Sequence, residues 1–155
     1  MNTLFMKKAI ELSRQHMNAG HGGPFGAVIV KDNQIIAEGW NQVTSIHDPT
    51  AHAEVNAIRQ ACKNLQTHDL SGCEIYTSCE PCPMCLAAIY WAHLDKIYFA
   101  NTRGDAATIK FDDDFLYEEI GKDISQRRIP AIQLLREEAL DVFNEWQRKT
   151  DKIPY

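Results

Sequence analysis

The 155-residue sequence predicts a single α/β domain, in which helices cover the faces of one sheet. Three observations predict this fold class. The middle of the chain alternates strand-like and helix-like segments in the order ββαβαβ. Hydrophobic residues make up 45% of the composition, enough for a sizeable core at this length. Internal repeats, low-complexity tracts and linkers are absent from the sequence, so one domain over residues 1–155 is expected.

The first half of the chain predicts four elements: a helix over 3–19, strands over 27–30 and 34–40, and a helix from about 48–50 to 65. Gly20 is placed to end the first helix. Asp48 or Thr50 is expected to cap the second helix, because a short polar side chain there can accept a free backbone N–H.

The second half predicts six more elements: a strand over 73–78, a helix over 80–91, a strand over 96–100, a short helix over 111–120, a last strand over 132–135 and a last helix over 137–149. Pro81 and Pro83 are tolerated only in a first helical turn, where the N–H groups lack partners within the helix.

Charge and hydropathy limit the function classes. The net charge is −5, which argues against a large nucleic-acid footprint but excludes nothing about a small ligand. No apolar run approaches the length that a membrane span needs. The N-terminal lysines follow the apolar residues, which is the wrong order for a signal peptide, so a cytoplasmic protein is the default expectation.

Two short motifs carry the chemistry: His52-Ala53-Glu54 (H-x-E) and Pro81-Cys82-Pro83-Met84-Cys85 (P-C-x-x-C). Thiolates and a neutral imidazole are ligands that zinc prefers, and three protein ligands leave the fourth position for water. This pattern is typical of zinc-dependent nucleobase deaminases. The sequence therefore predicts one Zn²⁺ per chain, bound by His52, Cys82 and Cys85, with Glu54 close by but not a ligand.

The expected reaction is hydrolytic deamination by zinc-bound hydroxide. Zinc with three protein ligands lowers the pKa of its water to about 7. Glu54 would take the proton of that water, pass it to a ring nitrogen and then protonate the departing amine. Since His52 and Glu54 are two residues apart and cannot share a face within a helix, the motif also predicts a helix that starts near residue 52.

A structural zinc site is the alternative reading of the same motifs. Cys79, Cys82 and Cys85 with His52 would make a closed Cys₃His site. Such a site gives no reason for Glu54, which favours the catalytic reading. Cys79 is better explained as a free thiol at the end of a strand.

Five segments resemble the bacterial guanine deaminases of the cytidine-deaminase-like superfamily: residues 22–27 (GGPFGA), 48–54 (DPTAHAE), 76–85 (YTSCEPCPMC), 88–92 (AIYWA) and the C-terminal part with 111–115 (FDDDF) and 152–155 (KIPY). The resemblance covers nearly the whole chain. It implies a three-layer α/β/α fold with a central mixed sheet of about five strands. It also implies a domain-swapped homodimer, in which the C-terminal segment, about 137–155, crosses to the partner subunit.

The resemblance further implies five substrate contacts. They are Asn41 and Asp113 on the purine, Phe25 and Trp91 against its ring, and Tyr155 arriving from the neighbouring chain. Other readings stay open: Asn41 as a turn residue, Trp91 as a core residue and Asp113 as a solvated charge. A carboxylate such as Asp113 suits the N1–H and 2-amino donors of guanine, whereas the N1 of adenine is an acceptor.

The expected function is therefore deamination of guanine to xanthine and ammonia, with a small purine base as the partner molecule and neither a membrane nor a nucleic acid. Three alternatives remain at this point. A tRNA adenosine deaminase shares H-A-E and P-C-P-M-C, although the net charge speaks against it. A cytosine or pteridine deaminase would use the same zinc chemistry. A non-catalytic zinc-binding interaction module belongs to a different class, and the intact Glu54 speaks against it.

Overall fold

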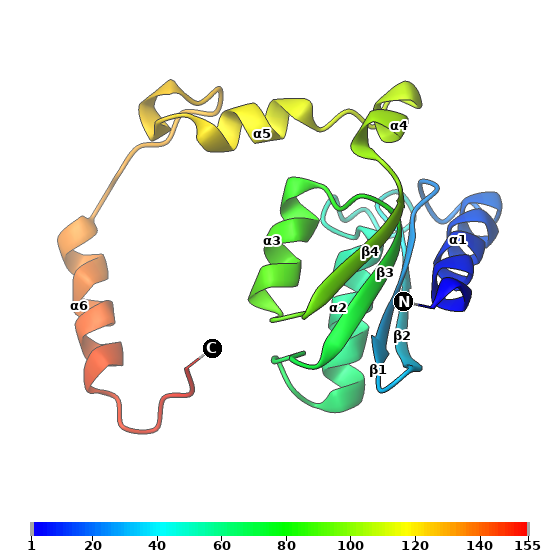
Figure 1. Cartoon of the computed structure of the whole chain (residues 1–155). Coiled ribbons are helices and arrows are strands. Elements are labelled where there is room, and N and C mark those ends of the chain that lie inside the picture. The colour runs from blue at the N-terminus through cyan, green and yellow to red at the C-terminus, as the bar shows by residue number, and fades with distance from the viewer. Residues whose placement is uncertain (1, 155) are drawn as a thin grey trace. The chain divides into compact units, whose positions relative to one another are not determined.

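The protein was analysed as a computed structural model, which describes residues 2–154. The chain divides into two compact units, residues 1–113 and residues 114–155. The first unit contains all the strands of the described chain, in a sheet of order β2-β1-β3-β4 (Figure 1). The strands are β1 (Gly26–Lys31), β2 (Gln34–Trp40), β3 (Cys73–Cys79) and β4 (Lys96–Asn101). β1 pairs antiparallel with β2 and β3, and β3 pairs parallel with β4, so the sheet is mixed.

Helices cover both faces of this sheet (Figure 1). α1 (Thr3–Asn18) packs on one face, where Leu12 joins the cluster of Val28, Val30 and Tyr76. α2 (Ala53–Leu65) and α3 (Pro83–Trp91) supply the opposite layer. The second apolar cluster lies in that layer. It contains side chains from every second position of the strands, including Ile29 and Ile75, because alternate residues of a strand point to the same face of the sheet. This three-layer arrangement confirms the predicted fold class.

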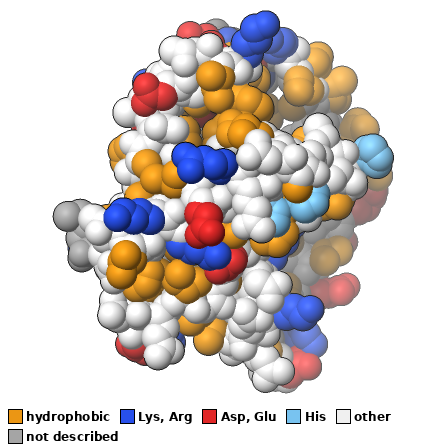
Figure 2. All heavy atoms as spheres, turned by 90° about the vertical axis from the view of Figure 1, so that its right-hand side faces the viewer, with side chains coloured by type: hydrophobic (Ala, Val, Ile, Leu, Met, Phe, Trp, Pro, Cys, Tyr) orange, Lys and Arg blue, Asp and Glu red, His pale blue; other side chains and the backbone are white. Residues whose placement is uncertain are grey.

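Charged side chains of both signs lie on the outer surface of the molecule on the side of α1. Figure 2 shows Lys and Arg among Asp and Glu there, with apolar side chains between them. One pair joins α1 to β2, with Lys8 Nζ 3.4 Å from Glu38 Oε1. Such a mixed surface differs from the single-sign basic face that a large nucleic-acid footprint requires.

Two features of β1 and β2 position the start of α2. The hairpin turn has positive φ at Asp32 (49°) and Asn33 (60°), as a two-residue turn compatible with strand twist requires. At the other end of β2, Gly39 lies against the backbone of α2. A Cβ at Gly39 would fall 2.3 Å from the carbonyl oxygen of Ala53. Glycine therefore allows the sheet to touch the first turn of α2.

The helix starts differ from the predicted ones. The N-cap of α2 is His52, not Asp48 or Thr50. Asp48 instead stabilises the preceding turn, where its Oδ1 accepts the backbone N–H of Thr50 at 2.8 Å. α3 begins at Pro83 with Cys82 as its N-cap, three residues later than predicted. Pro83 occupies the first helical position, where its missing N–H has no cost.

The chain after β4 contains three short elements and one longer helix: α4 (Arg103–Thr108), α5 (Asp114–Gly121), the 3₁₀ turn η1 (Ile124–Gln126) and α6 (Arg136–Arg148). α4 was not predicted, while the predicted last helix is confirmed as α6. The predicted strand over 132–135 is wrong, because residues 130–135 have no regular structure. The sheet of the described chain consequently has four strands where about five were expected.

The elements after β4 contain no buried residue in the described chain. Ala92 is the last buried residue of the described chain, and α5, η1 and α6 contain none. Over residues 2–154 no helix has both the length and the apolar character that crossing a membrane would need.

Candidate active site

Two helix N-termini bring the predicted metal ligands together. His52 is the N-cap of α2, and Cys82 is the N-cap of α3 with Cys85 in its first turn. One ligand atom from each of the three residues lies within 4.8 Å of the others. Both caps have extended backbone, which places their side chains just off the helix ends. The partial positive charge of two helix N-termini there favours thiolates.

The distances in this cluster fit a tetrahedral zinc. His52 Nδ1 lies 3.6 Å from Cys82 Sγ and 3.5 Å from Cys85 Sγ. Zinc bonds of ~2.05 Å to nitrogen and ~2.3 Å to sulfur at a tetrahedral angle place the two ligand atoms about 3.6 Å apart. The side chains are therefore already spaced as a zinc ion would space them. The donor set, one imidazole and two thiols, is also the one that zinc prefers.

The charges of the cluster are coupled. The hydrogen bond from Cys85 lowers the pKa of Cys82 to about 4, and His52 contributes to the same shift. The pKa of Cys85 is raised in turn by that hydrogen bond and by burial. The hydrogen bond with Cys82 raises the pKa of His52. The hydrogen bond between the two sulfur atoms therefore favours a negative charge on Cys82 and a proton on Cys85.

Glu54 faces the same cluster from the first turn of α2. Its side chain is only 6% exposed, and burial raises the pKa of its carboxyl group. Cys85 Sγ donates to Oε2 of Glu54 at 3.4 Å, and Thr77 Oγ1 lies 3.4 Å from Oε1. His52 and Glu54 can both face the cluster because His52 lies outside the regular helix. A buried carboxyl group beside a metal site is suited to proton transfer.

Thr77 was missed by the sequence analysis. It is the third inward-facing residue of β3 after Cys73 and Ile75, and it is 1% exposed. A polar residue among apolar ones on the inner face of a strand was the available signal. Its nearness to Glu54 depends on the packing of α2 against the sheet, which local sequence does not reveal.

Cys79 lies outside the cluster. It is the last residue of β3, and its Sγ donates to the carbonyl oxygen of Thr102 at 3.6 Å. Burial raises the pKa of Cys79 to about 11, so it remains a neutral thiol. Among the described residues, the metal-compatible group that includes His52 contains Cys82 and Cys85 but not Cys79. This arrangement favours an open three-ligand site over a closed Cys₃His site.

Asn41 and Phe25 belong to one loop assembly beside the cluster. Asn41 is 5% exposed, and its Oδ1 accepts the N–H groups of Gly23 and Val43, each at 3.2 Å. Its own N–H donates to the carbonyl of Phe25 at 3.1 Å. A Cβ at Gly22 would fall 2.3 Å from Asn41 Oδ1, so glycine is required there. Because two donors fix the oxygen, the amide nitrogen of Asn41 is the atom suited to address a ligand.

This assembly is tied to the metal cluster through the backbone. The N–H of Gln42 donates to the carbonyl of Ala51 at 2.9 Å, one residue before His52. Asn56 Nδ2 donates to the carbonyl of Trp40 at 2.8 Å. The end of β2 and the start of α2 are therefore held together.

The remaining predicted substrate contacts are Asp113, Trp91, Phe25 and Tyr155. Asp113 is half-buried and ends the first unit. Trp91 ends α3 and is 69% exposed, so the reading as a core residue of this chain is wrong. Phe25 makes an edge-to-face contact with Phe111, with ring centroids 5.0 Å apart. Tyr155 lies outside the described residues.

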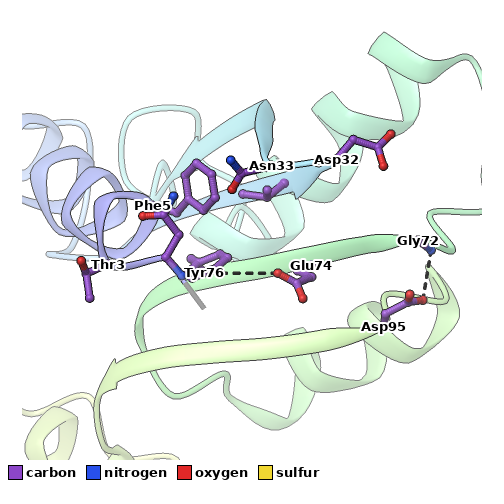
Figure 3. A pocket seen from close by; sticks show the side chains of 10 residues that line it. Thr3, Phe5, Asp32, Asn33, Gly72, Glu74, Tyr76 and Asp95 are labelled. Atoms are coloured by element: carbon purple, nitrogen blue, oxygen red, sulfur yellow. Dashed lines mark hydrogen bonds between the residues drawn. The ribbon is translucent and has the colours of Figure 1, made fainter.

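A separate pocket lies near the other end of β3, at its first residues. It has a volume of about 600 Å³, and Figure 3 shows Glu74, Tyr76 and Asp95 among its lining residues. Two of its carboxylates accept hydrogen bonds from this chain: Glu74 from the Tyr76 hydroxyl and Asp95 from the Gly72 N–H. None of the predicted site residues lines it.

Comparison with known proteins identifies the family. Residues 1–101 match the model of the cytidine and deoxycytidylate deaminase zinc-binding region. This match covers the cluster and both motifs, and the chain belongs to this family of zinc-binding deaminases.

Within that family, the chain is a homologue of guanine deaminase from Bacillus subtilis. The two are 54% identical over 151 residues, which is 97% of each chain. A crystal structure of guanine deaminase from B. subtilis superposes with a TM-score of 0.97, covering 100% of this chain and 99% of that one at 53% identity.

Two further relatives are more distant. A structure of guanine deaminase from Nitrosomonas europaea has a TM-score of 0.66 at 31% identity and covers 94% of this chain and 84% of that one. The tRNA-specific adenosine deaminase of Aquifex aeolicus is 42% identical, but over only 62% of this chain and 63% of its own length.

Proposed function

We propose that this protein is a zinc-dependent guanine deaminase, which converts guanine and water to xanthine and ammonia. The observation that carries the proposal is the extent of the similarity. The match to B. subtilis guanine deaminase spans 97% of the chain, so it includes the C-terminal third. The match to a tRNA-specific adenosine deaminase spans 62%. The zinc-binding core is common to both, and the C-terminal third separates them.

His52, Cys82 and Cys85 would hold one zinc ion per chain, a role supported by their 3.5–3.6 Å N···S spacing. When bound, the metal would supply a water of low pKa as the nucleophile. Glu54 is proposed as the proton shuttle. It would take one proton from that water and deliver it to a ring nitrogen, and would then take the proton of the hydroxyl added to the carbon and deliver it to the departing amine. Burial supports this role, because it raises the pKa of Glu54 and so makes the carboxyl group a better proton acceptor.

Guanine would be recognised by complementary hydrogen bonds. The Nδ2 of Asn41 offers a donor to an acceptor of the purine, because its Oδ1 is occupied by Gly23 and Val43. Asp113 offers an acceptor for the N1–H and 2-amino groups. Phe25 and Trp91 are proposed to contact the ring face, Trp91 through its exposed indole.

A second copy of the chain would complete the site. α6 has an apolar face in which Val142 (61%), Phe143 (72%) and Trp146 (46%) are exposed, and such a helix is stable only when that face is covered. We propose that residues 1–155 form one functional domain and that two such chains form a domain-swapped homodimer. In this dimer the segment of about 137–155 crosses to the partner, and Tyr155 closes the partner's site.

Mixing two defective chains tests the swap. A chain without residues 152–155 lacks the tail, and the Glu54→Gln chain lacks the proton shuttle. In a swapped heterodimer, the site with an intact Glu54 receives the intact tail, so refolding the two chains together should restore turnover. Absence of rescue in demonstrated heterodimers would exclude the swap.

Ammonia release from guanine, adenine, cytosine, guanosine and tRNA tests the activity itself. Release from guanine alone is expected. Release from tRNA would instead support an adenosine deaminase, the second candidate, for which the 42% identity to the A. aeolicus protein is the supporting observation. No release from any of these by the zinc-loaded protein would favour a binding module. Guanine deamination in the cytoplasm, as part of purine breakdown, completes the proposal.

A further inference from the structure

Thr77 is a buried hydroxyl beside the proposed proton shuttle. Its Oγ1 lies 3.0 Å from the carbonyl oxygen of Cys79 and 3.4 Å from Glu54 Oε1. The side chain is 1% exposed. Valine would fill the same volume on this inner face of β3, next to the apolar Ile75. Unlike valine, the hydroxyl reaches two acceptors: it donates to the Cys79 carbonyl at 3.0 Å, and Glu54 is the ionisable group within its reach.

The other side-chain contact of the Glu54 carboxyl group, with Cys85, would lose its donor in a zinc site. Cys85 Sγ donates to Glu54 Oε2 at 3.4 Å only while it carries a proton. A cysteine that binds zinc is a thiolate, which has no proton to donate. Of these two side-chain partners, Thr77 alone would keep its donor when the cluster binds metal.

The Thr77 hydroxyl can keep its contact with Glu54 in more than one way. Its O–H can donate to Glu54 or to the Cys79 carbonyl, whose oxygen lies 3.0 Å from Oγ1. The oxygen of the hydroxyl can also accept a hydrogen bond. A side chain with only donors or only acceptors lacks this freedom.

We infer that Thr77 is a positioning residue for Glu54, and that the hydroxyl of Thr77 holds the carboxyl group of Glu54 in place. This inference rests on the proposed function, in which Glu54 is the shuttle. It assigns no contact between Thr77 and the substrate. Removal of the Thr77 hydroxyl should therefore lower the rate of the chemical step and leave substrate binding unchanged.

The first test measures the position of Glu54 directly. Crystal structures of the zinc-loaded protein and its Thr77→Val variant should show one position of the Glu54 carboxyl group in the parent, within hydrogen-bond distance of Thr77. In the variant the group should move or occupy several positions. An unchanged single position of Glu54 would overturn the inference. If the protein binds no zinc, the proposed function fails, and the same comparison on the zinc-free protein still decides the role of Thr77.

The second test is kinetic and uses whichever base the protein turns over. Thr77→Val should lower kcat about 10- to 100-fold, the range for losing a hydrogen bond to a charged group, with KM and zinc content unchanged. Thr77→Ser keeps the hydroxyl and should restore most of kcat. Ile75→Val, on the same face of β3, controls for altered packing and should keep kcat. A normal kcat in Thr77→Val, a change confined to KM, or no recovery in Thr77→Ser would each contradict the assignment.

Discussion

Gly39 controls how closely β2 approaches the helix that carries His52 and Glu54. In a Gly39→Ala variant the new Cβ would fall 2.3 Å from the carbonyl oxygen of Ala53 and 2.5 Å from the amide nitrogen of Ala57. Both atoms are backbone, so no side chain can rotate away. Reaching ordinary contact requires the start of α2 to move back by about 1 Å, since carbon and oxygen or nitrogen atoms rarely approach below ~3.4 Å.

The expected cost follows from that displacement. Overpacking of a buried site costs about 1–3 kcal/mol, and the gain from replacing a strand glycine offsets about 0.5–1 kcal/mol. A net loss of about 1 kcal/mol corresponds to a fall in Tm of roughly 2–4 °C for a chain of this size. The same shift misplaces His52 and Glu54, and a misplacement of about 1 Å can lower turnover about 100-fold.

Thermal unfolding, zinc content and turnover should be measured together on Gly39→Ala and on a matched control. Gly104→Ala is that control, because the atom nearest to its new Cβ is Thr102 Oγ1 at an ordinary 3.6 Å. It lies in α4, where alanine favours the helix, so its stability should stay the same or rise. A Gly39→Ala protein with the Tm and turnover of the parent would refute the reasoning.

Three further predictions concern the cluster and Cys79, which lies outside it. Cys82→Ala should lose most of the zinc while Cys79→Ala keeps it, as measured by elemental analysis; equal losses would move Cys79 into the ligand set. Glu54→Gln should keep zinc but lower turnover by roughly 10²–10⁴-fold, and near-normal turnover would remove it as the shuttle. Because burial raises the pKa of Cys79 to about 11, its thiol should stay protonated and resist alkylation at pH 7–8. Rapid labelling of Cys79 in the zinc-loaded protein, detected by mass spectrometry, would contradict this.

The sequence predicted the cluster better than it predicted the elements around it. H-x-E and P-C-x-x-C are read from residue types alone, because the ligands must be those residues at that spacing. The expectation that a helix starts near His52 came from the same spacing and is confirmed by the N-cap position. The cap itself was assigned wrongly to Asp48 or Thr50, since a side chain able to cap a helix can equally close a turn.

The errors in the C-terminal third have a common physical cause. Residues 132–135 carry a strand-like apolar pattern, but a strand needs a neighbour to pair with, and their sequence does not specify one. α4 is six residues long, too short for an apolar period to become visible. Its capping box, in which Thr102 and Asp105 exchange hydrogen bonds, was the readable signal. The last helix, α6, was predicted correctly because its amphipathic pattern is strong and extends over several turns.

The three cysteines between residues 79 and 85 illustrate how backbone geometry decides the chemistry of identical side chains. Cys79 ends β3, where the carbonyl of Thr102 accepts from its thiol and burial keeps it neutral. Three residues later, Cys82 is a helix N-cap whose sulfur meets His52 and Cys85, and its pKa falls to about 4. Pro83 at the first position of α3 fixes where that helix starts, and therefore which cysteines face the cluster. A shift of that start by one residue would rotate Cys85 by about 100° around the helix axis, away from His52. The proline thus contributes to the metal site without donating an atom to it.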